Sequence, residues 1–163
     1  MKIRHKTSGA VIYDGPFTDL SKANMVEANL SEAYLHKANL SKANMAGADL
    51  SKAILSNANL SEAILIGANL SEANLSRANM VGAILADGVV VSYNNDVFSL
   101  GPLGSRRDTL HVFHTNVGPY FFAGCFSGTL DEFKCAVYKK HSNTAFKEEY
   151  LAAIKFVCER QKK

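Results

Sequence analysis

The chain has 163 residues and a mass of 17.7 kDa, which is enough for one domain or two small modules. Hydrophobic residues make up 47% of it, which excludes wholesale disorder, and no apolar run is long enough for a transmembrane helix. Eighteen basic and fifteen acidic residues give a net charge of +3, too small to indicate a nucleic-acid-binding protein by itself. No apolar secretory segment follows the basic start, so we expect a cytoplasmic location without membrane association.

Residues 1–17 form the first of three predicted segments. Within them, the sequence GAVIYDGP at residues 9–16 predicts a short β-strand that ends in a turn. We expect this segment to cap the repetitive segment that follows, because the end of a repeat array exposes apolar side chains and unpaired backbone groups.

Residues 18–87 repeat every five positions. Leu or Met recurs fourteen times in register from residue 20 to residue 85, and Ala stands two positions before it thirteen times. A period of five fits neither a helix nor a flat strand, so the chain must turn a corner in each unit. Four units then close a coil of twenty residues, with one small and one large apolar side chain pointing inward from each unit.

The pattern A(N/D)LxX resembles that of the pentapeptide-repeat family, over 70 of the 163 residues. The resemblance implies a mainly β fold, a right-handed quadrilateral β-helix, followed here by a small C-terminal module. The chain order also resembles phage and prophage pentapeptide-repeat proteins, through residues 9–15, GPLGSRRD at 101–108 and GCFSGTLDEF at 124–133. That second resemblance implies a phage context and no active site.

Outward positions of the repeat can carry function, because residues twenty apart are expected to stack along one face. One column reads Val, Ala, Ile, Ala and its neighbour reads Asn, Asn, Ile, Ile, while Gly47 and Gly67 leave that side flat. This apolar face predicts a protein-binding or dimer surface. The alternative is that the C-terminal segment of the same chain packs there. The predicted surface residues are Val26, Ile64, Ile66 and Ile84.

Some pentapeptide-repeat proteins inhibit DNA gyrase by imitating duplex DNA, which requires a long acidic face. Residues 18–87 contain seven acidic and five basic residues, and the bases are interleaved with the acids. A net charge of −2 is a poor copy of a phosphate ladder. The sequence therefore places DNA mimicry behind protein binding, and it disfavours duplex nucleic acid as a partner.

Residues 88–163 predict a small α+β module with a three- or four-stranded meander and two helices. Expected strands are residues 89–93, 97–100, 109–115 and 119–123, with a turn at 94–96 and a stop at Gly101-Pro102. Thr129 and Glu132 form a capping box that starts the first helix. Residues 141–143 end it, and the second helix is expected over residues 144–161.

The loop at residues 101–108 is the densest functional-looking stretch of the chain. Its two glycines, hydroxyl and two guanidiniums could cradle an anion, such as the phosphates of a nucleotide, although the spacing is not that of a Walker loop. The alternative is a tight hairpin loop with surface arginines paired to the aspartate. The candidate ligand-binding residues are Gly104, Ser105, Arg106, Arg107 and Asp108.

Cysteine and histidine chemistry is the weakest signal. Cys125 could act as a nucleophile with His111, His114 or His141 as base, but no hydrolase signature surrounds it, and a buried thiol is the alternative. His111 and His114 stand three apart on a predicted strand and should face opposite sides, so no metal site is expected. No cofactor is expected either.

These observations together predict a non-enzymatic, phage-associated binding protein in the host cytoplasm. Its leading function is protein–protein interaction: homo-oligomerisation, with a dimer as the first expectation, and engagement or inhibition of a host protein. Binding or sequestration of a nucleotide-like anion by the C-terminal module is the alternative. DNA mimicry and a Cys125-dependent activity stand behind these two.

Overall fold

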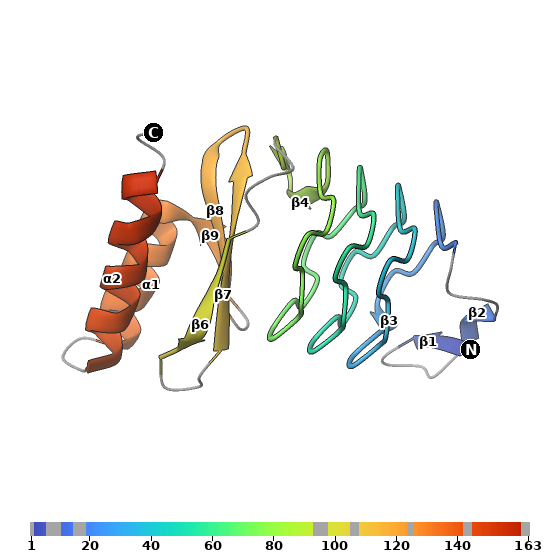
Figure 1. Ribbon diagram of the computed structural model, residues 1–163, viewed down its shortest axis with the longest axis horizontal. Helices are drawn as coiled ribbons and strands as arrows, with labels where there is room; N and C mark the ends of the chain where they lie inside the picture. Colours follow the sequence, from blue (N-terminus) through green and yellow to red (C-terminus); the bar gives the residue numbers. More distant parts are fainter. Residues whose placement is uncertain are drawn as a thin grey trace.

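The computed structural model describes residues 2–5, 11–14, 19–92, 98–104, 108–123, 126–141 and 145–160. The molecule is elongated, with a pair of strands at one end, a β-helical coil in the middle, and a four-stranded sheet and two helices at the other end (Figure 1). The elements are, in chain order, β1 (Lys2–His5), β2 (Val11–Asp14), β3 (Ala28–Asn29), β4 (Ile84–Ala86), β5 (Val89–Val90), β6 (Phe98–Leu103), β7 (Asp108–Thr115), β8 (Gly118–Ala123), β9 (Phe126–Thr129), α1 (Leu130–Lys140) and α2 (Ala145–Arg160).

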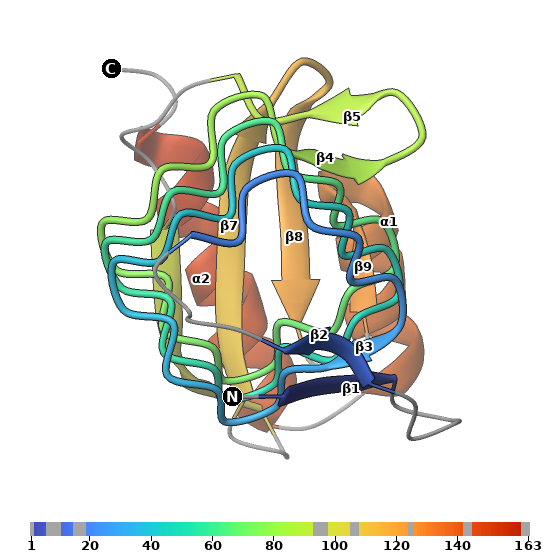
Figure 2. The same cartoon turned by 90° about the vertical axis from the view of Figure 1, so that its right-hand side faces the viewer.

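The repeat segment winds as a coil of twenty residues, as predicted. Parallel β-bridges join residues twenty apart along the segment, from Asp19 with Asn39 to Ile64 with Ile84. Successive coils exchange backbone hydrogen bonds of 2.7–3.1 Å, and Figure 2 shows these coils stacked nearly in register. Every Leu and Met of the period is at most 2% exposed, and the alanines from Ala28 to Ala83 are at most 7% exposed. The five-residue register thus fills the axis with alternating small and large apolar side chains.

Each corner of the coil depends on one residue with a left-handed backbone. The N–H of each repeat Ala donates to the carbonyl of the Leu or Met three residues earlier, which closes a tight turn. The residue just before that Ala has a positive φ between 51° and 76°. Gly occupies this position at residues 47, 67 and 82, whereas charged or amide residues occupy it elsewhere. Non-glycine residues pay a steric cost of about 1–2 kcal/mol in this conformation.

Replacing Lys52 by glycine should therefore stabilise the protein. Lys52 has a φ of 59° and is exposed, and its side chain makes no hydrogen bond or ion pair with the described residues, although its backbone N–H donates to the Ser71 carbonyl at 2.8 Å. Relief of the steric cost outweighs the added entropy of the unfolded chain, so we expect a gain of about 0.5–1 kcal/mol in the free energy of unfolding. Urea denaturation of Lys52→Gly against the wild type measures it.

Ser51→Gly is the matched control, because Ser51 lies in the same turn but has no positive φ. Glycine there adds only unfolded-state entropy, so it should destabilise the protein by about 0.5–1 kcal/mol. Equal effects of the two substitutions would contradict the assignment of strain to the Lys52 position.

The N-terminal strands lie at the first coil. β1 pairs antiparallel with β2 and also with β3, through Arg4 with Asn29 and His5 with Ala28. β2 lies within the predicted strand at residues 9–16, whereas β1 was not expected from the sequence. The β1–β3 pairing supplies backbone partners to an edge of the first coil, which is the task expected of a cap.

The C-terminal sheet is an antiparallel meander in the order β6-β7-β8-β9, and it separates the coil from the helices (Figure 1). Alternate side chains of β7 and β8 pack into two different hydrophobic cores, one in the coil and one between the sheet and the helices. Phe113, Tyr120 and Phe122 join the buried cluster of the coil. Leu110 and Phe121 face the other way and join the buried residues of α1 and α2. The sheet is thus buried on both faces and seals the last coil.

Three strands differ from the sequence prediction. The strand expected over residues 89–93 is β5 (Val89–Val90), which pairs antiparallel with β4 in a separate sheet and is not part of the meander. β6 does not stop at Gly101-Pro102 but continues to Leu103. The pairing with β7 shifts register between Leu100 and Leu103, where β6 has one extra residue. Such a bulge tolerates a proline, which has no backbone N–H to donate. β9 pairs with β8 where only a lead into the helix was expected. The expected turn at residues 94–96 lies outside the described residues.

The helices agree closely with the expectation. The Glu132 carboxylate accepts hydrogen bonds of 2.8 Å from both the backbone N–H and the hydroxyl of Thr129, so the capping box is present. α1 ends at Lys140 with His141 as its C-cap, and Phe133 and Val137 are its buried residues. In the part of the chain described here, no helix has the length and apolar character needed to span a bilayer.

Candidate interaction surface

The predicted isoleucine column exists as a stack of bridged residues. Asn24, Asn44, Ile64 and Ile84 follow one another through parallel bridges from the first coil to the last. Their side chains point outward, so Ile64 and Ile84 are half-buried although they lie in a β-helix.

The neighbouring outward column adds further apolar area. Val26 is 37% exposed, and Ile66 is half-buried. The corner beside it carries Gly67, at which an added Cβ would meet no atom within 4 Å, so the corner is open and flat. Exposed Glu27 lies at this corner in the first coil, and exposed Asp87 lies in the turn between β4 and β5. We call Val26, Ile64, Ile66 and Ile84 the isoleucine face.

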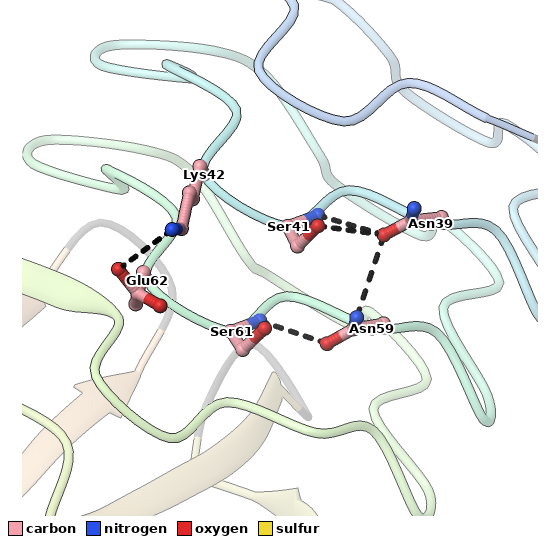
Figure 3. A network of polar contacts seen from close by, with 6 residues as sticks. All are labelled: Asn39, Ser41, Lys42, Asn59, Ser61 and Glu62. Carbon is pink, nitrogen blue, oxygen red and sulfur yellow. Dashed lines mark hydrogen bonds and ion pairs between the residues drawn. The ribbon is translucent and has the colours of Figure 1, made fainter.

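The outward column through Tyr34 and Ile54 is also apolar, with exposed fractions of 66% and 37%. The remaining outward columns are mainly polar and are tied together by side-chain ladders. Figure 3 shows one of them: the side-chain oxygen Oδ1 of Asn39 accepts hydrogen bonds from the backbone N–H and the hydroxyl of Ser41, and the Asn59 side-chain amide donates to it from the next coil at 3.4 Å. At the adjacent corner, Lys42 and Glu62 form an ion pair of 3.5 Å. This corner column reads Lys22, Lys42, Glu62 and Gly82, so it carries both signs of charge, which is unlike the uniform charge of a phosphate ladder.

The C-terminal sheet covers the end of the coil. The residues that it adds to the coil core lie on β7 and β8, across the last turn of the coil. The link is continuous in the backbone as well: Val91 accepts from Gly82 and donates to Ala83 in the last coil, and it forms a bridge with Thr115 of β7. The isoleucine face keeps its partial exposure beside this seal.

The predicted anion-binding loop is described only in part. Gly104 is buried, and its N–H donates a hydrogen bond of 2.9 Å to the Glu149 carboxylate, so a carboxylate of the chain itself occupies this donor. A Cβ at Gly104 would lie 2.6 Å from Tyr150 ring atoms, which explains the glycine. Ser105, Arg106 and Arg107 lie outside the described residues, as does Cys125. Asp108 is described as the first backbone residue of β7.

The family model for pentapeptide repeats matches residues 17–51 and 53–87, in eight copies. Through these residues the chain belongs to the pentapeptide repeat family. No curated protein sequence gives a significant match to the chain.

Solved structures of other pentapeptide repeat proteins are similar to part of the chain. One from the cyanobacterium Cyanothece is 40% identical, over 41% of this chain and 49% of its own, with a TM-score of 0.35. HetL of the cyanobacterium Nostoc, described as involved in heterocyst differentiation regulation, is 35% identical over 45% of this chain and 41% of its own, with a TM-score of 0.28. One from the thylakoid lumen of Arabidopsis thaliana is 30% identical over 42% of this chain and 50% of its own, with a TM-score of 0.23. This chain spans half the length or less of each of these proteins.

One histidine of this pentapeptide repeat protein is buried between the sheet and the last coil. His111 is 1% exposed, its Nδ1 lies 2.8 Å from the Ser99 hydroxyl, and its Nε2 has no hydrogen-bond partner among the described residues. It shares a side of β7 with Phe113, toward the last coil. The alternation of residues 109–115 already placed His111 and Phe113 on one face, but nothing local indicated that the coil would cover that face.

Proposed function

We propose that this pentapeptide repeat protein is a non-enzymatic binding scaffold, in which a right-handed quadrilateral β-helix presents the isoleucine face to a protein partner. Pentapeptide repeat proteins are generally non-enzymatic scaffolds, which supports the coarse assignment. The observation that carries the assignment of a binding face is the grouping of Ile64, Ile66 and Ile84 in two adjacent outward columns of the coil. Flat apolar surface with charged rims is typical of protein interfaces.

A second copy of the chain is the first partner to test. The isoleucine face has no charged residue within its two columns, so two copies can approach without burying an unpaired charge. The C-terminal module with its α+β arrangement then caps the coil and leaves its sides free. Engagement of a host protein by a phage-encoded chain is the wider form of this hypothesis, and the same face would carry it.

Ile66→Lys should abolish the association. A lysine in the centre of an apolar interface forces burial of an ammonium group without a partner, so we expect the dissociation constant of the dimer to rise roughly tenfold or more. Sedimentation velocity over a range of protein concentrations measures the change.

Ser76→Lys is the matched control. Ser76 takes the same place in its repeat unit, and it lies two units further along the coil, on the opposite side. It is exposed, and a lysine there should leave the association unchanged. A wild-type protein that stays monomeric at every concentration, or an equal effect of both lysines, would show that self-association through this face is wrong.

A further inference from the structure

A small pocket lies in the C-terminal part of the molecule, on the helix side of the sheet. It has a volume of about 70 Å³ and is open to solvent on one side. The rings of Phe126, Phe133 and Tyr150 form part of its wall, and Ala123, Ala136 and Val137 add further apolar surface. Lys140 and His141, at the end of α1, complete the lining. The pocket is far from the isoleucine face and is independent of the proposed scaffold function.

The apolar wall of the pocket is rigid. Phe133 packs against Phe126 with ring centroids 5.3 Å apart and against Tyr150 at 5.7 Å. Tyr150 is fixed in turn from behind, because Gly104 lies directly against its ring. Three elements, β9, α1 and α2, therefore hold the aromatic rings in place without any ligand.

Among the described residues, the lining of the pocket contains no acidic side chain. His141 is 8% exposed, and its imidazole makes ring contacts with Tyr150 and Phe146 but no side-chain hydrogen bond among the described residues. The exposed Lys140 has no ion pair within the same part of the chain. Of the other lysines of the helices, Lys134 pairs with Asp131 at 3.5 Å and Lys147 lies over the Tyr138 ring, whereas Lys139 and Lys155, like Lys140, have no ion pair among the described residues.

We propose that this pocket binds a short-chain monocarboxylate. The hydrocarbon chain would lie on the aromatic rings, and the carboxylate would accept hydrogen bonds from Lys140 and His141. The size supports a ligand of this kind, because a volume of about 70 Å³ admits only a few non-hydrogen atoms, with the rest of the ligand at the mouth of the pocket. Apolar walls with a few convergent polar groups are typical of small-molecule sites.

The test uses butyrate as the probe and the full chain as the protein. Butyrate should perturb the amide NMR signals of residues 136–141 and saturate with a dissociation constant of roughly millimolar size, as expected for so few atoms. Butanol, which has no charge, and inorganic phosphate, which has no hydrocarbon chain, should each bind at least about tenfold more weakly. Absence of saturation with butyrate, or equal binding of butanol, would overturn the proposal.

Matched variants separate binding in the pocket from general charge effects. Lys140→Gln should weaken butyrate binding several-fold, whereas Lys139→Gln removes the same charge from a residue that does not line the pocket and should not. Ala136→Leu should fill the pocket and abolish binding, whereas Ala152→Leu, on the exposed side of α2, should not. If Ala136→Leu fails to fold, the lysine pair decides the matter, and equal affinities of Lys140→Gln and Lys139→Gln would overturn the site.

Discussion

Replacing Phe113 by alanine should lower the free energy of unfolding by about 3–5 kcal/mol and open the last coil to solvent. Phe113 is fully buried, belongs to the same cluster as the Leu and Met side chains of the coil, and meets Phe122 edge-on with ring centroids 5.5 Å apart. Its removal leaves a cavity between the sheet and the end of the coil, where neither layer can collapse without breaking backbone pairing. Urea denaturation measures the loss, and amide hydrogen exchange shows where it occurs.

Phe121→Ala is the matched control for Phe113→Ala. Phe121 is equally buried but stacks on Phe133 at 4.9 Å, on the helix side of the same sheet. We expect a similar loss of stability, because the same number of atoms is removed. Faster amide exchange should then appear in α1 and α2 for Phe121→Ala, and in residues 67–86 for Phe113→Ala. The same exchange pattern in both variants would contradict a seal made by one face of the sheet.

Acidification should weaken the same seal through His111. Burial lowers the pKa of His111 from 6.5 to about 4, and a weaker interaction with the Leu70 backbone opposes that shift, although Nε2 has no partner with good hydrogen-bond geometry. Between pH 6.5 and 4 the unfolded chain binds a proton at this residue and the folded chain does not, so stability falls as the pH falls. Above pH 6.5 this titration does not reduce the free energy of unfolding, and by pH 4 it has lowered that free energy by about 3 kcal/mol.

His111→Gln isolates this effect from the titration of carboxylates and of the other histidines. Glutamine keeps an uncharged polar group that can reach Ser99, and it does not titrate. The free energy of unfolding of both proteins, measured by urea denaturation from pH 7 to pH 4.5, should converge or cross as the wild type loses its advantage. Parallel pH profiles would show that His111 does not titrate on unfolding in this range.

The repeat sequence predicted only part of the structure of the coil corners. Gly47 and Gly67 indicated a flat side of the coil, and the structure leaves the corner at Gly67 open. The same position also has a positive φ at Lys52 and at nine other non-glycine residues, which the sequence did not indicate. Lysine and glutamate have no intrinsic preference for this conformation, so only the closed coil imposes it.

Pairing between distant segments limited the prediction elsewhere. β1 pairs with β3, which is more than twenty residues further along the chain, and the sequence of β1 contains no turn signal that predicts this pairing. β9 is four residues long and includes Gly128, so its composition favours a loop over a strand. Both strands form because a neighbouring strand offers a free edge, which is a property of the assembled sheet.

The amino-acid sequence by itself determined the twenty-residue coil, the inward and outward side chains of every repeat unit, the isoleucine face and the capped start of α1. Each of these follows from spacing along the chain, because the period of five and the Thr129–Glu132 pair act over a few residues. Only the tertiary structure decided that β7 and β8 seal the last coil, that His111 is buried there, and that Lys140 and His141 meet three aromatic rings in a pocket. These contacts join segments that are far apart in sequence, and burial between layers depends on how whole elements pack.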